Sequence, residues 1–150
     1  MLGSLAKWLR IFGYDVKFAK EKEKNEVSGL ILDSLRESRV LLTRNQSLSR
    51  KSAWKLVLLR SDKLVEQLKQ VINETGIKIS KDRLFTRCSA CNGRIEPVKD
   101  KNEIQGSVPE YVHSTHNEFS RCTGCKKIYW KGTHWELLLT DLKKAGLKIE

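Results

Sequence analysis

The chain has 150 residues, of which 39% are hydrophobic and 31% are charged, which is enough for one modest core and a small metal-stabilised module. Its formal net charge of +11 favours polyanionic partners. No apolar run approaches the ~20 residues of a membrane span, and the amino end lacks the n-region and h-region of a signal peptide. We therefore expect a cytoplasmic protein that does not span a membrane.

The first residues have the pattern of an amphipathic helix. Between Met1 and Phe12, apolar side chains at helical spacing form one stripe, and Gly13 is expected to end the helix. Residues 14–18 then alternate between apolar and polar as in a strand.

The next part of the chain indicates a parallel sheet. Residues 39–43 and 55–59 are short, nearly continuous apolar runs, which are typical of strands covered on both faces. Helical spacing precedes the first run and follows the second, where Ser61 is the expected N-cap and Gly76 the expected end of the helix. This alternation predicts a small α/β fold with a parallel sheet.

The cysteines form two CxxC pairs, Cys88 with Cys91 and Cys122 with Cys125, separated by residues 92–121. Two such turns can direct four thiolates at one tetrahedral Zn²⁺, so we interpret them as a closed structural site of the zinc-ribbon type. Two disulfides, a redox CxxC motif or iron held by the same sulfurs remain alternatives. Because all four ligands come from the protein, the metal is expected to stabilise the fold and not to catalyse a reaction.

The sequence therefore indicates two domains, an α/β domain over residues 1–83 and a zinc ribbon with a C-terminal helix over residues 84–150. The pattern weakens into an expected linker at residues 77–83. Residues 128–131 are expected to form a ribbon strand, and apolar spacing over 135–142 predicts an amphipathic closing helix.

Basic residues gather where the parallel strands are expected to end. Between residues 36 and 63 there are eight Lys or Arg and only two acidic residues, a net charge of +6. The loops beyond the strands are Lys20 to Glu26, Arg44 to Lys51 and Arg60 to Lys63, and functional sites of open parallel sheets lie in such loops. Contact with phosphate groups is the functional interpretation, and an ordinary solvated surface is the alternative.

We identify six basic residues as candidate nucleic-acid contacts. They are Arg44, Arg50, Lys51, Arg60, Lys127 and Lys131. The last two adjoin Tyr129 and Trp130, a mixture of basic and aromatic side chains that suits base stacking but is also compatible with a core position.

Several separate motifs, in order, resemble the Mut-seven C-terminal RNase family. They are Met1-Leu2-Gly3, Leu5 to Arg10, Gly13-Tyr14-Asp15, Arg39 to Arg44, Arg60-Ser61-Asp62, Glu66-Gln67-Leu68, both CxxC pairs, Val108-Pro109, Tyr129-Trp130 and Gly132 to Trp135. The resemblance covers nearly the whole chain. It implies a PIN-like nuclease domain followed by a zinc ribbon, with RNA as the substrate class.

The resemblance also implies a catalytic Mg²⁺ or Mn²⁺ held by acidic residues. Glu26 matches one expected acid, whereas Asn45 and Ser47 occupy positions that are aspartates in the family pattern, and we name Glu26 and Asn45 as the catalytic candidates. Family members usually carry a first strand ending in aspartate ahead of Met1, so the first strand of the PIN-like sheet is expected to be missing.

These departures leave two hypotheses of different class. One is a metal-dependent ribonuclease of the PIN-like type whose first strand and aspartate are expected upstream of Met1, so that this chain would have little activity. The other is a catalytically inactive PIN-like protein that binds RNA or a ribonucleoprotein.

Overall fold

The computed structural model describes residues 2–19, 24–50 and 52–150, with the side chains of 24–27, 133 and 134 not described. The chain divides into two compact units. We call residues 1–6 and 17–77 the sheet unit, and residues 7–16 and 78–150 the ribbon unit. Helix α1 (Leu2–Ile11) therefore contributes residues to both units. The predicted domain boundary between residues 83 and 84 stays a prediction.

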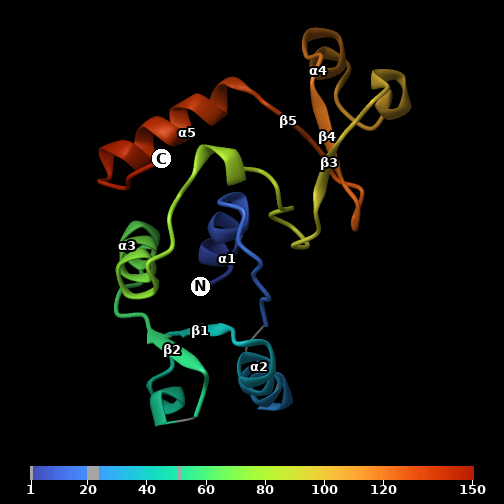
Figure 1. Cartoon of the computed structure of the whole chain (residues 1–150). Coiled ribbons are helices and arrows are strands. Elements are labelled where there is room, and N and C mark those ends of the chain that lie inside the picture. The colour runs from blue at the N-terminus through green and yellow to red at the C-terminus, as the bar shows by residue number, and fades with distance from the viewer. Residues whose placement is uncertain (1, 20–23, 51) are drawn as a thin grey trace. The chain divides into compact units, whose positions relative to one another are not determined.

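The sheet unit contains the predicted parallel strands β1 (Val40–Thr43) and β2 (Lys55–Leu58), which lie side by side (Figure 1). In their register Val40 faces Lys55 and Thr43 faces Leu58, so both strands end at the same edge. The Leu59 amide continues the ladder by donating to the Thr43 carbonyl over 2.7 Å. The buried side chains of Leu41, Val57 and Leu59 explain why both runs are apolar.

Two helices accompany these strands, α2 (Lys24–Glu37) before β1 and α3 (Leu64–Thr75) after β2. Gly76 ends α3 in the left-handed conformation, with φ of 73°, as predicted. The predicted N-cap is wrong, because Lys63 occupies that position. The Ser61 hydroxyl instead accepts the Lys63 amide over 3.0 Å in a turn that precedes the helix.

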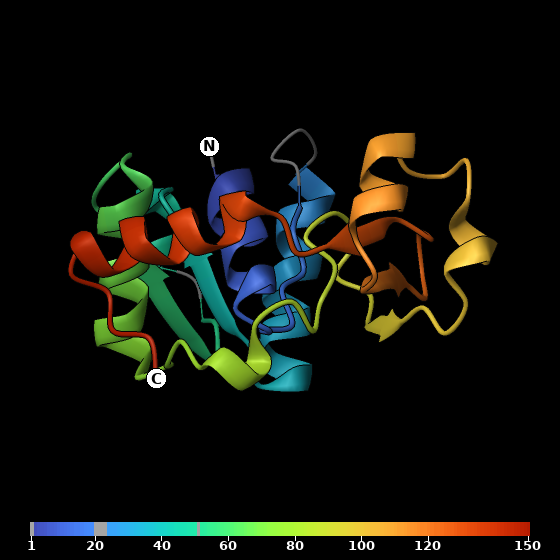
Figure 2. The ribbon, with the colours of Figure 1, turned by 90° about the horizontal axis from the view of Figure 1, so that it is seen from above.

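The ribbon unit is built on the antiparallel strands β3 (Ile95–Pro97), β4 (Phe119–Cys122) and β5 (Ile128–Trp130), with β4 in the centre. The segment between β3 and β4 contains the short helix α4 (Glu110–Thr115), beside the strands in Figure 2. This segment has its own core, because Ile104 and Val108 are buried with Phe119. The closing helix is α5 (Thr133–Lys144).

These elements confirm the predicted α/β class with a parallel sheet, a four-cysteine ribbon and a closing helix. Helix α1 ends at Ile11, and Gly13, the residue expected to stop it, follows in a turn with a φ of 90°, in the region that glycine adopts most easily. A Cβ atom at Gly13 would also collide with the Arg83 carbonyl, which is a second reason for glycine there. Within the described residues, the helices are all too short or too polar to cross a membrane.

The predicted strand over residues 14–18 is wrong, because the described residues there form no ladder. Side chains take the backbone groups that a neighbouring strand would need. The Val16 amide donates to Asn92 Oδ1 over 3.0 Å, and the Val16 carbonyl accepts the Arg10 guanidinium over 2.8 Å. Alternation alone could not reveal these side-chain partners.

The expected linker at residues 77–83 is also corrected, because its residues in the ribbon unit are packed and paired. Ile79 is buried and forms a parallel bridge with Ile149 near the end of the chain. Hydrogen bonds join the Glu150 amide to the Ile79 carbonyl and the Lys81 amide to the Glu150 carbonyl, each over 2.8 Å. The partner lies far along the sequence, so the local pattern gave no sign of it.

Candidate metal centre and candidate nucleic-acid interface

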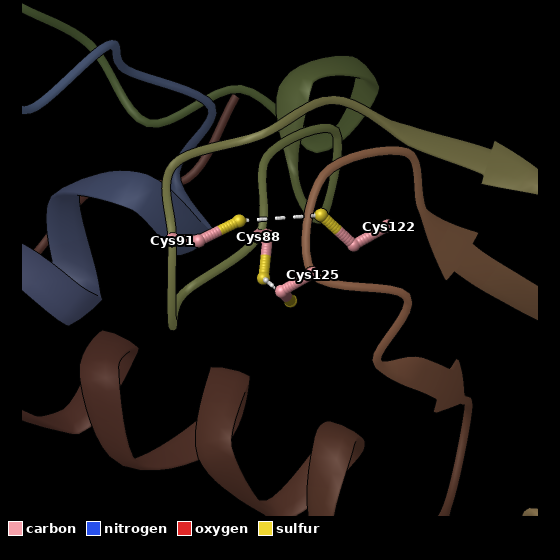
Figure 3. Close-up of side chains that lie close together, drawn as sticks. All are labelled: Cys88, Cys91, Cys122 and Cys125. Carbon is pink, nitrogen blue, oxygen red and sulfur yellow. Dashed lines mark hydrogen bonds between the residues drawn. The ribbon is translucent and has the colours of Figure 1, made fainter.

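The four cysteines converge in the ribbon unit, where their Sγ atoms all lie within 4.8 Å of one another (Figure 3). We call residues 88–91, which precede β3, the first knuckle, and residues 122–125, which start at the last residue of β4 and lead toward β5, the second knuckle. Across the knuckles, Cys88 Sγ is 3.6 Å from Cys125 Sγ, and Cys91 Sγ is 3.4 Å from Cys122 Sγ. These distances exceed the ~2.05 Å of a disulfide bond.

The two knuckles share one backbone pattern. In the first, the Cys88 carbonyl accepts the Asn92 amide, and the Cys88 amide donates to Gly93. In the second, Cys122 makes the equivalent bonds with Lys126 and Lys127. Each turn requires a residue of positive φ, supplied by Asn92 at 71° and Lys126 at 67°. The sequence therefore closes both turns without placing a glycine at the left-handed position.

Gly93 is required for space next to the sulfurs. A Cβ atom there would lie 2.8 Å from Cys122 Sγ and 3.2 Å from Cys91 Sγ. The amides near this point face sulfur, since Gly93 donates to Cys91 over 3.4 Å and Gly124 donates to Cys122 over 3.3 Å. Such donors stabilise thiolates.

This donor set fits a tetrahedral metal ion. Sulfur atoms ~2.3 Å from a central zinc would be about 3.8 Å apart, close to the measured separations across the knuckles. Four cysteine sulfurs are ligands that a soft or borderline metal prefers. The four residues could therefore hold a metal ion such as zinc, as predicted from their spacing.

The local environment gives the thiols of Cys88 and Cys125 very different pKa values. Burial acts to raise the pKa of Cys88, but hydrogen bonds from Tyr129 and from the Cys91 and Ala90 amides outweigh it and lower the pKa to about 6. For Cys125 the Lys127 amide acts to lower the pKa, but burial and the neighbouring thiols outweigh it and raise the value to about 11. These contacts thus favour the thiolate at Cys88 and the protonated thiol at Cys125.

Tyr129 is a contact of the site that the sequence did not assign to it. Its hydroxyl lies 2.9 Å from Cys88 Sγ and 3.4 Å from Ser89 Oγ. Burial, followed by the hydrogen bond with Cys88, raises the pKa of Tyr129 to about 12. The phenol therefore keeps its proton beside the sulfur.

The end of α1 and the segment that follows it hold the first knuckle. Arg10 is only 9% exposed, and its guanidinium donates to the Ser89 and Ala90 carbonyls over 3.2 and 3.3 Å. Asn92, just after the knuckle, donates to Asp15 Oδ1 over 2.6 Å. Sequence reasoning assigned no such role to Arg10, because its acceptors lie 79 and 80 residues away along the chain.

The histidines that can be described bind backbone carbonyls near α4. His113 Nε2 lies 2.9 Å from the Lys101 carbonyl oxygen, and His116 Nδ1 lies 3.2 Å from the Val112 carbonyl oxygen. These contacts fix the segment between β3 and β4. The side chain of His134 lies outside the described residues.

In the sheet unit, the shared register of β1 and β2 brings two basic loops to one edge. Arg44 follows β1 directly and is half-buried, while Arg50 ends the 3₁₀ helix Gln46–Arg50 and is exposed. Arg60 lies two residues beyond β2, is exposed, and pairs with Glu74 over 3.3 Å. Lys51 lies outside the described residues.

Asn45 is held in a local turn. Its Oδ1 accepts the Ser47 amide over 3.0 Å and the Ser47 hydroxyl over 2.7 Å. The backbone amide of Asn45 donates to Thr43 Oγ1. The side chain of Glu26 lies outside the described residues, so the catalytic assignments of Glu26 and Asn45 stay predictions.

Several acidic side chains of the sheet unit are already paired with basic or amide groups. Asp33 and Glu37 both bind Lys17, and Glu74 accepts Arg60 and Gln70. In the part of the chain that the structure describes, the cysteines are the one group of three or more His, Cys, Asp or Glu placed to hold a metal.

The candidate contacts of the ribbon unit lie near β5. Lys127 and Lys131 are exposed, and Lys127 Nζ lies 5.4 Å from the centroid of the Tyr129 ring. Trp130 is 38% exposed, and its ring is tilted against that of Phe119, with 6.5 Å between ring centroids. Trp130 is therefore partly in the core and partly at the surface, whereas the Tyr129 hydroxyl contacts the cysteine cluster.

Comparison with protein families finds one described as the Mut7-C RNAse domain, whose model matches residues 1–141. Comparisons with curated proteins and with solved structures give no significant match.

We predict that the Arg10 side chain stabilises the ribbon unit. Arg10→Met removes the donors to Val16, Ser89 and Ala90 and should lower the free energy of unfolding by about 3 kcal/mol, because three partly buried carbonyls lose a charged partner. Chemical denaturation of the metal-loaded chain measures this loss. Arg94→Met is the control, since Arg94 is exposed in the same unit. Equal stability of the two variants would contradict the prediction.

Proposed function

We propose that this chain, which belongs to the Mut7-C RNAse domain family, binds RNA at the edge of its parallel sheet and uses a structural zinc ion in its ribbon. One observation carries the RNA proposal. The register of β1 and β2 places the loops after both strands at one edge, where Arg44, Arg50 and Arg60 lie. The predicted cytoplasmic location belongs to the same proposal.

The loop after β2 is held by two buried amides, which supports a preformed site. Gln67 is 2% exposed and donates to the Ser61 carbonyl over 2.9 Å. Gln70 donates to the Leu58 carbonyl over 2.8 Å and accepts the Arg60 amide over 3.1 Å. The backbone at Arg60 therefore has a fixed direction, which reduces the ordering cost of binding.

The existing ion pair at this edge is weak enough for a phosphate to replace it. Arg60 and Glu74 form an exposed pair, and exposed pairs contribute about 0–1 kcal/mol. A phosphate can replace Glu74 as the partner of the guanidinium at little cost and can accept two parallel hydrogen bonds. Sequence preference would require base contacts, which these arginines do not define.

For the ribbon we propose zinc held by Cys88, Cys91, Cys122 and Cys125. The purified chain should contain one zinc ion, with an apparent binding energy of about 10 kcal/mol that is coupled to folding of the ribbon. Cys122→Ser should lose the metal and unfold this module first, whereas Ser89→Ala, which changes a non-ligand within the first knuckle, should retain it. Metal analysis and thiol titration provide the test; iron in place of zinc, or four freely titrating thiols, would contradict it.

Binding to single-stranded RNA should weaken steeply as salt increases, because each phosphate contact releases counterions. Arg44→Ala and Arg50→Ala should each reduce the slope of log affinity against log salt by about 0.7. Lys55→Ala is the matched control, since it removes the same charge at the opposite end of β2. Unchanged slopes in both arginine variants, or an equal reduction in the control, would count against this edge.

Hydrolysis is the second function, and family membership is the observation that favours it. We expect the unaltered chain to cleave RNA weakly with Mn²⁺, because the amide of Asn45 cannot supply the negative charge that draws a divalent ion from water. Asn45→Asp should increase Mn²⁺-dependent cleavage. It should also keep the fold, since aspartate can accept the same two bonds from Ser47.

Adding Glu26→Ala to Asn45→Asp should remove the increase, if Glu26 is a metal ligand. Brisk cleavage by the unaltered chain that survives Glu26→Ala would show that the active site lies elsewhere. The RNA-binding proposal would stand in that case, because the salt series measures binding without cleavage.

A further inference from the structure

We propose that the Tyr129 phenol is part of the metal centre: it donates a hydrogen bond to the Cys88 thiolate and reduces the charge and reactivity of that one ligand. The inference rests on the proposed zinc site. It assigns Tyr129 a positioning role that four-cysteine spacing does not predict.

The geometry fixes the direction of the bond. Tyr129 Oη and Cys88 Sγ are 2.9 Å apart, a short contact for sulfur. A cysteine bound to a metal is a thiolate and has no proton to donate. The phenol must therefore be the donor, which makes this a charge-assisted hydrogen bond.

Burial explains why Cys88 needs such a donor. Cys88 and Cys122 are fully buried, whereas Cys91 and Cys125 are exposed and can accept hydrogen bonds from water. An anionic sulfur removed from water is unstable unless other donors replace the solvent. Cys122 receives the Gly124 amide, and Tyr129 provides a side-chain donor for Cys88.

Two neighbours of Tyr129 support its role as a donor. Ser89 Oγ lies 3.4 Å from the Tyr129 oxygen and can donate to it, which strengthens the phenol as a donor in turn. Lys127 Nζ lies 5.4 Å from the ring centroid, where its charge withdraws electron density from the phenol. Lys127 is therefore placed to act on the metal centre through Tyr129.

The position in the strand explains how Tyr129 reaches the sulfur. Tyr129 pairs with Ser120 in the register of β4 and β5, and side chains alternate along β5, so its neighbours Ile128 and Trp130 lie on the opposite face. Ile128 and Trp130 contact the Phe119 core. Side chains on one face of this short strand thus pack against the core, and Tyr129 on the other face contacts the proposed metal site.

A cobalt-substituted chain tests this proposal. Tyr129→Phe should shift the sulfur-to-cobalt charge-transfer band to lower energy, because a thiolate that accepts one hydrogen bond fewer is more easily oxidised. The same variant should bind zinc about tenfold more weakly, the lower end of effects from outer-shell partners. Tyr14→Phe is the matched control. It loses a phenol that binds the Lys78 backbone in the same unit, and should leave the band unchanged.

A second measurement applies even if Tyr129→Phe does not fold. Ring-fluorinated tyrosine, incorporated into the unaltered chain, keeps the hydroxyl and makes it a stronger donor, so the band should move to higher energy. A band that moves in neither experiment would overturn the role of Tyr129. Failure of the unaltered chain to bind Co²⁺ or Zn²⁺ would instead overturn the proposed metal site.

Discussion

Four sulfur atoms within 4.8 Å of one another impose the main electrostatic constraint on the ribbon unit. Metal ligation requires thiolates, and two unit charges ~4 Å apart repel each other by about 4 kcal/mol at an effective dielectric constant of ~20. Against the effect of the Lys127 amide, burial and hydrogen bonds with the neighbouring thiols raise the pKa of Cys125 to about 11, so the cluster without a cation resists full ionisation. A divalent cation among the sulfurs turns repulsion into attraction. The closed form of both knuckles and the presence of metal should therefore be thermodynamically linked.

This linkage reaches the beginning of the ribbon unit through backbone contacts. The Arg10 guanidinium binds two carbonyls of the first knuckle and the Val16 carbonyl, so one buried cation connects residues 7–16 to the cysteines. Buried charges are retained where several acceptors surround them, and removal of such partners is costly. If the first knuckle opens, Arg10 loses acceptors, and the segment from Gly13 to Val16 loses a support. A ligand defect in the ribbon would then be felt at the start of the chain, far away in sequence.

Local rules predicted the elements that local forces determine. Gly13 and Gly76 end their helices as expected, the apolar runs before Arg44 and Arg60 are parallel strands, and the CxxC spacing brings four sulfurs together. Predictions failed where a distant partner replaced a local one. Val16 has side-chain partners in place of a neighbouring strand, and Ile79 pairs with Ile149. Tyr129 is a further case in which a distant partner decides the role. The basic residues beside it in the sequence suggested stacking on bases, and only the antiparallel register places it beside Cys88.

The two proposed activities have different physical requirements, and the chain meets them with different residues. Zinc in the ribbon needs closed ligation, which the cysteines supply, and outer donors such as Tyr129 then adjust the charge on sulfur. RNA at the sheet edge needs positive charge in a fixed place but no closed site, and the buried Gln67 and Gln70 hold the loop without neutralising its arginine. Charge alone would attract any polyanion. A fixed backbone adds geometry to that attraction, because it limits the phosphate positions that Arg60 and its neighbours can reach together, and discrimination among polyanions depends on that limit.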